Sequence, residues 1–475
     1  MSGRKITIEP VTRIEGHERD TIHLNEAGAV EQTFLHVDEF RGLEKFSEGR
    51  PYFEMPQITQ RICGICPVSH HLASAKACDA ILGVDPPRPA KLLRELMHMG
   101  QYVQSHGMHF FHLAAPDLLL GFDSDPRTRN VFGIIQANPE LALKAVNLRR
   151  YGQQIIERLG GKRVHPNLAV PGGVNAPLRP ADRDAIAAER DEQLAFAQEA
   201  LTILKAWISQ NGDLAGHFAA FPSNYMGLAN DQGALELYEG QVNVRNREGQ
   251  SLGRFPTQAY LDCVAEHVEP WSFLKFPYYR PLGWPQGGYR VGPLGRLNTA
   301  AEIATPLANL ELKAFKQTGN GRPVEGSLYY HYARLIELLY ALERIGDILD
   351  DKEILGTDIR AYGTGKLTGH GIGIIEAPRG TLIHDYTTDA DGLLVRVNLI
   401  VATGHNNWAM NEAVGTVARA FVVGNELTEG MLNRVEAAIR CYDPCLSCST
   451  HAIGQMPLEI VLRSANGTAL DRRVR

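Results

Sequence analysis

Two closely spaced cysteine pairs stand near opposite ends of this 475-residue chain. Cys63 and Cys66 form the early pair, and Cys445 and Cys448 form the late pair. The Cys-x-x-Cys spacing of each pair places two sulfurs close enough to chelate one metal ion. Thiolates are soft ligands that select zinc, nickel, copper or iron rather than magnesium or calcium. If the fold brings the pairs together, they form a complete four-sulfur site.

A structural zinc site is the common alternative interpretation of paired cysteines. Zinc ribbons usually separate their two pairs by about 15 to 20 residues. Here most of the chain lies between the pairs. A site that joins both ends of a long polypeptide is more typical of a buried reaction centre than of a local structural clip.

Both pairs lie in longer motifs that resemble those of a known family. RICGICPVSH at 61–70 is similar to the N-terminal RxCGxCxxxH signature of nickel-iron hydrogenase large subunits, and DPCLSCSTH at 443–451 resembles their C-terminal DPCxxCxxH signature. The likeness spans nearly the whole chain and is closest to the bidirectional, NAD-reducing hydrogenases. Three further segments look like family segments: EPVTRIEGH at 9–17, EFRGLE at 39–44 and EAPRG at 376–380.

The resemblance implies a nickel-iron centre in which Cys63 and Cys445 are terminal nickel ligands. Cys66 and Cys448 would bridge nickel to an iron that carries cyanide and carbon monoxide. Such a centre would cleave dihydrogen heterolytically, with a terminal thiolate such as Cys445 taking the proton. Glu15 corresponds to the family glutamate that relays this proton, and its alternative is an ordinary salt-bridged or surface carboxylate.

The same resemblance assigns roles to residues around the metals. Arg379, which follows Pro378, would lie over the metals and hydrogen-bond a cyanide nitrogen, or it forms an ordinary ion pair. Asp117 would orient that arginine, although an aspartate after proline is also a common turn or helix-cap residue. His70 would donate a hydrogen bond to a bridging sulfur.

Glu44 and His451 correspond to the ligands of a separate magnesium or iron near the mature C-terminus. A lone histidine is more often a core residue with satisfied hydrogen bonds than a metal ligand. The other cysteines, Cys78, Cys263 and Cys441, fit no signature, and we expect them to be buried small hydrophobic residues.

The hydrogenase interpretation requires partner subunits. The chain lacks further cysteines in iron-sulfur spacing, so an iron-sulfur small subunit must carry the electrons away. The NAD-reducing likeness adds flavin and iron-sulfur diaphorase subunits that would hold FMN, iron-sulfur clusters and NAD; otherwise NADP or a deazaflavin is the acceptor. No phosphate loop is present, since GTGK at 363–366 lacks the first glycine and the final Ser or Thr of that motif.

Two other functions compete with catalysis. The large-subunit homologue of respiratory complex I shares the body but lacks the thiolate set that this chain keeps. A structural or assembly protein stabilised by zinc is the second alternative. Metal analysis separates the hydrogenase from both alternatives, because nickel with iron supports the hydrogenase and zinc alone supports the structural protein.

Residues 452–475 follow the last motif. In the family, nickel-insertion proteins load the metal and a maturation protease then removes such an extension after the motif histidine. We therefore expect residues 1–451 to form a single catalytic domain. The alternative is a native strand pair, because EIVLRSANGTALD at 459–471 has hairpin character.

The elements that position these residues are predicted to be mainly helical. Residues 1–56 form a β-rich part with a small N-terminal sheet, and residues 57–451 form a helical body with active-site loops. The fold class is thus mainly α with minor β: a large helical bundle with peripheral β segments, as in the nickel-iron hydrogenase large subunit.

Three helices have the clearest apolar periodicity. One starts after Pro89 and its apolar stripe extends to Leu113. A second spans 327–349, with Glu337 on its wetter face. A third, within 427–440 and capped by Thr428, delivers the chain to the late cysteine pair.

Composition excludes several classes of protein. A net charge of −6 without a basic block argues against nucleic-acid binding. Hydrophobic residues make up 44% of the chain, yet no run of about 18 apolar residues predicts a membrane span. The N-terminus has no secretory signal, so we expect a cytoplasmic protein.

Overall fold

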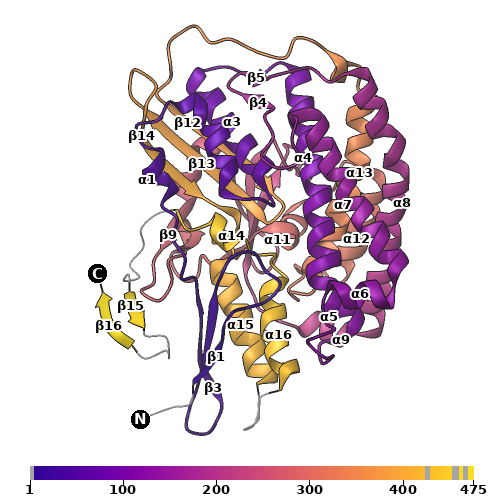
Figure 1. The fold of residues 1–475 in the computed structure, drawn as a ribbon, viewed down its shortest axis with the longest axis vertical. Coiled ribbons are helices and arrows are strands. Elements are labelled where there is room, and N and C mark those ends of the chain that lie inside the picture. The colour runs from indigo at the N-terminus through magenta and orange to yellow at the C-terminus, as the bar shows by residue number, and fades with distance from the viewer. Residues whose placement is uncertain (1–4, 423–427, 452–458, 464–468, 475) are drawn as a thin grey trace.

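The computed structural model describes residues 5–422, 428–451, 459–463 and 469–474 (Figure 1). The fold is mainly helical with minor β structure, as predicted. Long helices lie side by side in one half of the molecule, and a three-stranded sheet covered by α3 fills much of the other half. None of the helices in these ranges is long and apolar enough to cross a membrane.

The predicted N-terminal sheet is present. Its antiparallel strands are β1 (Lys5–Ile8), β2 (Arg19–Leu24) and β3 (Val30–His36), in that order. The sheet packs against α15 (Asn407–Phe421), which α16 (Glu429–Arg440) follows, so an early and a late segment of the chain lie side by side (Figure 1). The predicted N-cap of α16 is confirmed, because the Thr428 hydroxyl accepts a hydrogen bond from the N–H of Met431.

The helical body is built around α4 (Arg88–Met108), α7 (Pro139–Gly160), α8 (Pro180–Gln210) and α13 (Tyr329–Asp350). α4 and α7 pack closely because both carry glycine at the contact: a Cβ on Gly152 would lie 2.6 Å from the carbonyl oxygen of Gly100. Beyond these come shorter elements: α1 (Leu43–Ser47), α2 (Met55–Thr59), α6 (Val131–Ala137), α9 (Gly212–His217), α10 (Tyr260–Cys263), α11 (Gly292–Thr299), α12 (Pro306–Gln317) and α14 (Ala402–His405).

The helix predicted after Pro89 differs from the prediction at its end. α4 stops at Met108 and continues as a π-helical turn, His109–Ala114, before α5 (Ala115–Leu120). The wider turn changes the register, so Leu113 is only half-buried. π-turns within helices are frequent at functional sites.

Two predictions about single residues were wrong. Glu337 does not face water: it is fully buried, because α13 is covered by α4, α8, α11 and α12. Cys263 is partly exposed at the end of α10, whereas Cys78 and Cys441 are buried as expected.

The sheet beside the helices places one important turn. Its antiparallel strands are β12 (His370–Ala377), β13 (Gly380–Thr388) and β14 (Leu394–Ile400). Ala377 pairs with Gly380, so Pro378 and Arg379 form a two-residue hairpin turn. α3 (Pro67–Leu82) packs directly on β12, where a Cβ on Gly373 would lie 2.0 Å from the carbonyl oxygen of Ala73.

A four-stranded sheet has the order β11 (Tyr289–Arg290), β6 (Asn224–Ala229), β7 (Gln241–Arg245) and β8 (Ser251–Phe255). Near the C-terminus, β15 (Glu459–Arg463) and β16 (Ala469–Val474) form an antiparallel hairpin beside the body (Figure 1), in the segment where hairpin character was predicted. The remaining strands are β4 (Ala169–Val170), β5 (Gly173–Val174), β9 (Val264–His267) and β10 (Phe276–Tyr279).

Candidate metal centre

The fold brings the two cysteine pairs together. The sulfurs of Cys63, Cys66, Cys445 and Cys448 all lie within 4.8 Å of one another, and all four residues are buried. Cys63 Sγ lies 3.5 Å from Cys445 Sγ, which joins the early pair to the late pair. Within the described residues this is the one group of three or more potential metal ligands that lie so close together. The fold therefore gathers four sulfurs that could hold a metal centre.

The backbone at the early pair favours a thiolate. The N–H groups of Ile65 and Cys66 both donate to Cys63 Sγ at 3.2 Å. A hydrogen bond from the Cys66 thiol is the main cause that lowers the pKa of Cys63; burial opposes it, while the charge of Arg379 and the two N–H groups act in the same direction. Cys63 is therefore prepared to lose its proton to a metal.

The N-terminal segment lies directly along the late pair. Glu15 and Cys445 form a parallel bridge, and the N–H of Leu446 donates to the carbonyl oxygen of Glu15 at 3.1 Å. Gly16 has φ 86°, and a Cβ there would lie 2.8 Å from Leu446 Cβ. The contact thus requires glycine at this position.

A small cavity adjoins the sulfurs. Cys66, Cys445 and Cys448 line one side. The rest of its wall is mostly apolar, with Ala377, Leu382, Val401 and Ala402, and includes His70, Arg379 and Thr403. Soft thiolates beside a dry apolar wall fit transition metals that carry small diatomic ligands.

Arg379 overhangs this cavity from the hairpin turn between β12 and β13. Its Nε donates to the carbonyl oxygen of Asp443 at 2.6 Å, and its Nη2 donates to Asp443 Oδ1 at 2.9 Å. Burial opposes its charge, but Asp443 and the neighbouring thiols keep the pKa of Arg379 raised. Nη1 is buried without a hydrogen-bond partner among the described residues. A ligand in the cavity would satisfy that donor. Pro378, predicted with Arg379, does not line the cavity.

The expected contact between Asp117 and Arg379 is not formed. Asp117 instead accepts hydrogen bonds from Arg13 Nη2 at 2.5 Å and from Arg440 Nη1. Asn433 Nδ2 adds a third at 3.0 Å. Arginines that lie closer to Asp117 occupy its carboxylate, and Asp443 takes the place that was predicted for Asp117.

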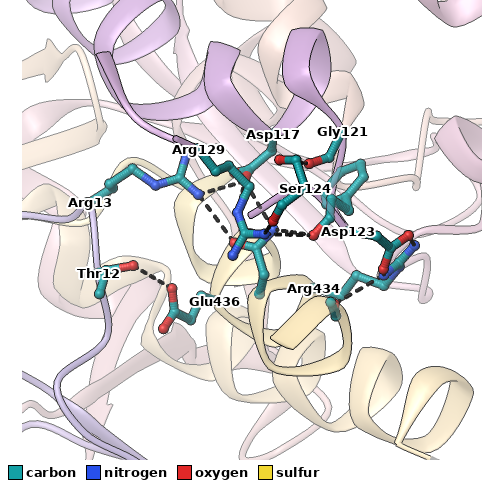
Figure 2. A network of polar contacts seen from close by, with 12 residues as sticks. Thr12, Arg13, Asp117, Gly121, Asp123, Ser124, Arg129, Arg434 and Glu436 are labelled. Atoms are coloured by element: carbon teal, nitrogen blue, oxygen red, sulfur yellow. Dashed lines mark hydrogen bonds and ion pairs between the residues drawn. The ribbon is translucent and has the colours of Figure 1, made fainter. Parts of the chain in front are cut away.

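The network around Asp117 clamps the N-terminal segment onto α16 (Figure 2). Arg440 Nε donates to the carbonyl oxygen of Thr12 at 3.0 Å, and the Thr12 hydroxyl donates to Glu436 Oε2 at 2.5 Å. Since Glu15 follows Thr12 and α16 leads into Cys445, this network fixes both partners of the Glu15–Cys445 contact.

The side chain of Glu15 is anchored beside the late cysteine pair. Its Oε1 accepts a hydrogen bond from the Ser447 hydroxyl, two residues beyond Cys445. Its Oε2 is buried and has no hydrogen-bond partner within the described residues. One carboxylate oxygen is therefore anchored and the other is available.

His70 lines the cavity with Cys66 and Cys448. Its Nδ1 lies 3.2 Å from His384 Nε2, and His384 Nδ1 lies 2.5 Å from the Tyr386 hydroxyl. Burial lowers the pKa of His70 well below its usual value and lowers that of His384 to about 3. With Nδ1 engaged, Nε2 is the ring nitrogen of His70 that remains for a sulfur.

Glu44 and His451 are linked indirectly, through Leu399. Glu44 Oε1 accepts from the N–H of Leu399 at 2.7 Å, and Leu399 and His451 line a second cavity of about 320 Å³. His451 Nε2 contacts the carbonyl oxygen of Cys448, which leaves Nδ1 buried without a partner among the described residues. Burial lowers the pKa of His451 to about 4, so this nitrogen has a free lone pair.

Sequence reasoning gave no role to several residues of the site. Asp443 was visible within the late motif, but its pairing with Arg379 was not. Thr403, whose hydroxyl accepts from the Cys445 N–H at 2.9 Å, and His384 come from distant segments with no signal of their own.

Comparisons with known proteins agree with this geometry. A family model described as nickel-dependent hydrogenase matches residues 41–120 and 223–451, and a HoxL-like model matches residues 5–40. The chain is 41% identical to the NAD-reducing hydrogenase HoxS subunit beta of Cupriavidus necator, over 99% of this chain and 100% of that protein. It is 43% identical to a subunit of the F420-non-reducing hydrogenase of Methanothermobacter thermautotrophicus, over 94% and 95%.

Solved structures share the fold. A crystal structure of an NAD+-reducing [NiFe]-hydrogenase in the H2-reduced state superposes with a TM-score of 0.92 at 44% identity, covering 95% of this chain and 100% of that one. A Ni-Fe-Se hydrogenase from Desulfovibrio vulgaris Hildenborough superposes with a TM-score of 0.77 at 24% identity, covering 95% and 100%, which shows the common fold.

Proposed function

The chain belongs to the family of nickel-iron hydrogenase large subunits, and from that premise we propose that it catalyses the reversible, heterolytic cleavage of dihydrogen. The observation that carries the proposal is the buried group of four sulfurs within 4.8 Å of one another, beside a cavity that Arg379 overhangs. The family also contains proteins without this thiolate set, so the sulfurs decide between catalysis and a purely structural role.

Cys63 and Cys445 would hold nickel as terminal ligands, and Cys66 and Cys448 would bridge nickel to iron. Both cysteines assigned as bridging line the cavity, together with Cys445, so a metal held by Cys66 and Cys448 would border it. When bound, the metals supply an open coordination position that polarises dihydrogen, and cyanide and carbon monoxide on iron tune it.

The protein's own groups then manage the proton and the charge. The Cys445 thiolate takes the proton, and the free Oε2 of Glu15 accepts it while Ser447 anchors Oε1. The free Nη1 of Arg379 would donate to a cyanide nitrogen, and the apolar wall would exclude water. His70, which lines the same cavity, would donate from Nε2 to a bridging sulfur and tune its basicity.

We assign a second cation, magnesium or iron, to Glu44 and His451. The unpartnered Nδ1 of His451 and the carboxylate held by Leu399 support this assignment. His451 contacts the carbonyl oxygen of Cys448, so the cation would brace the end of the mature chain.

Electrons would leave through the early pair to an iron-sulfur small subunit. Gly64, between the two cysteines, is exposed. An apolar groove formed by Leu43, Phe46, Phe53 and Ile58 lies beside Arg61 on the same surface, and Phe46 and Phe53 are 54% and 57% exposed. This groove is the docking surface that we propose for the small subunit.

We propose NAD as the final acceptor, reached through flavin and iron-sulfur diaphorase subunits, by analogy with the NAD-reducing relative. Relatives named F420-non-reducing hydrogenases are about as similar. Hydrogen-dependent reduction of NAD+ by the purified complex tests the acceptor, and reduction of artificial dyes alone would contradict it.

We also propose that a maturation protease removes residues 452–475 after nickel insertion, leaving residues 1–451 as one catalytic domain. The hairpin of β15 and β16 pairs with itself, so its removal would break no strand of the body. An intact mass ending at His451 in the active enzyme is expected; active enzyme that retains Arg475 would contradict it.

Metal analysis and infrared spectroscopy of the purified complex test the central proposal. We expect nickel and iron together with infrared bands of metal-bound cyanide and carbon monoxide. Cys448→Ser should lose them, whereas the matched control Cys263→Ser should keep them. Zinc alone in the wild-type protein would instead support a structural site.

Glu15→Gln tests the proton route. Glutamine keeps the hydrogen bond to Ser447 but cannot carry a proton. We expect normal metal content and infrared bands, with at least a tenfold loss of hydrogen–deuterium exchange with water. Normal exchange would remove Glu15 from the mechanism.

A further inference from the structure

Arg296 is a fully buried cation on α11 whose hydrogen bonds are all satisfied. Its Nε and Nη2 donate to the two carboxylate oxygens of Glu337 at 2.6 and 2.7 Å. Its Nη1 donates to Glu376 Oε2 at 2.7 Å and to the carbonyl oxygen of Ala377 at 2.9 Å. Nη2 also donates to the carbonyl oxygen of Pro378 at 3.0 Å. The five donors of a guanidinium thus meet five acceptors.

Three of these acceptors belong to the segment that ends at Arg379. The carbonyl oxygen of Glu376 is held separately, by His98 Nε2 at 2.8 Å and by the Tyr102 hydroxyl at 2.9 Å. Consecutive carbonyl groups of residues 376–378 are therefore each bonded to a buried side chain from α4 or α11. The turn that carries Arg379 has little freedom to move.

Stability alone does not explain a buried cation between two carboxylates. Desolvation of buried ion pairs is so unfavourable that well-packed apolar residues of similar size are often as stable or more stable. Apolar residues could replace Arg296, Glu337 and Glu376 as a packed core. They could not supply the two N–H groups that fix the carbonyl oxygens of Ala377 and Pro378.

We propose that Arg296 is a positioning residue for Arg379. By donating to the carbonyl oxygens of Ala377 and Pro378, Arg296 fixes the hairpin turn in the position from which Arg379 Nη1 can reach a ligand in the cysteine cavity. This inference rests on the proposed function, since that ligand is the iron-bound cyanide. Glu337 fixes the orientation of the Arg296 guanidinium through two hydrogen bonds. His106 Nε2 lies 2.9 Å from Glu337 Oε2 and in turn holds that carboxylate.

Arg296→Lys in the purified complex tests the inference. Lysine keeps the charge but has no planar fork, so it cannot bond Glu337 and both carbonyl groups together. We expect unchanged nickel and iron per chain, cyanide infrared bands that shift more than the carbonyl band, and at least a tenfold loss of hydrogen oxidation.

Arg290→Lys is the matched control. Arg290 is equally buried and donates to the backbone carbonyl oxygens of Glu325 and Phe221, but it makes no hydrogen bond to residues 376–379. It should lower the melting temperature without shifting the bands. Equal band shifts in both variants, or none in Arg296→Lys, would overturn the inference.

If Arg296→Lys does not fold, Tyr102→Phe tests whether the contacts to residues 376–378 position Arg379. It removes one donor from the carbonyl oxygen of Glu376 and leaves the ion pairs intact, so a smaller shift of the cyanide bands is expected. Unshifted bands would then overturn the inference. Wild-type protein without any such bands would reject the proposed function itself, a separate outcome.

Discussion

Replacing Asp117 by asparagine removes the charge on which the clamp of Figure 2 converges. Asp117 is 4% exposed and accepts hydrogen bonds from Arg13, Arg440 and Asn433. Asparagine has nearly the same shape and keeps one oxygen acceptor. It leaves the partly buried Arg13 without a counterion and leaves the buried Arg440 with Glu436 alone, and it turns an amide N–H₂ toward one of the two guanidinium groups.

The expected loss in the free energy of unfolding follows from these contacts. A hydrogen bond to a charged group contributes about 1.5–3 kcal/mol, and breaking a buried pair by removing one partner costs about 3–5 kcal/mol. We therefore expect Asp117→Asn to lower the free energy of unfolding by about 3–5 kcal/mol. Asp123→Asn is the matched control: Asp123 is 72% exposed and pairs with Arg434 in the same region, and such pairs contribute about 0–1 kcal/mol.

The pH dependence gives a second check. Burial alone would raise the pKa of Asp117, but the charges of Arg440 and Arg13 and their hydrogen bonds outweigh burial, so its pKa is lowered. The contribution of Asp117 is then fully present above the unfolded pKa of about 3.9 and is lost as the pH falls through the lowered folded value.

Thermal unfolding of both variants, followed by circular dichroism between pH 8 and pH 5, measures the effect. We expect a decrease of several degrees for Asp117→Asn across this range and almost none for Asp123→Asn. Equal decreases in the two variants would refute the reasoning, as would a loss that varies between pH 8 and pH 5.

Two further predictions follow from buried groups. Burial, and then the charge of Glu436, raises the pKa of Asp20, so any stability from its carboxyl is present at low pH and is lost as the pH rises through the raised value. Asp20→Asn should therefore raise the melting temperature at pH 8 and raise it less at pH 5. A lower melting temperature at pH 8 would contradict this. Gly373→Ala should destabilise by about 1–3 kcal/mol in denaturant unfolding, because its Cβ would lie 2.0 Å from the carbonyl oxygen of Ala73, whereas Gly212→Ala, with open space around it, should change little.

The sequence predicted the residues of the site better than their partners. The spacing of the cysteines predicted thiolate chemistry, and the surrounding motifs pointed to Glu15 and Arg379. The convergence of both pairs could not be derived from spacing, because it depends on how the whole body packs. Asp117 shows the limit: its partners Arg13 and Arg440 lie 104 and 323 positions away in the chain.

Helical periodicity succeeded for helices with one buried face and failed elsewhere. Glu337 occupies the polar stripe of α13, which predicts contact with water. Other helices cover that stripe, and Arg296 and His106 meet the carboxylate there. The π-helical turn at His109–Ala114 was also invisible, because one extra residue per turn leaves no compositional signal.

The contact between the first and last segments of the body has a consequence for biosynthesis. A ribosome makes the early cysteines near the beginning of translation and the late cysteines close to its end. Until synthesis reaches Cys445, a nascent chain offers only the early pair of sulfurs, and any premature stop before codon 448 leaves no complete centre. The full set of sulfurs therefore exists only once Cys448 has been made, so possession of the centre reports that synthesis passed this residue.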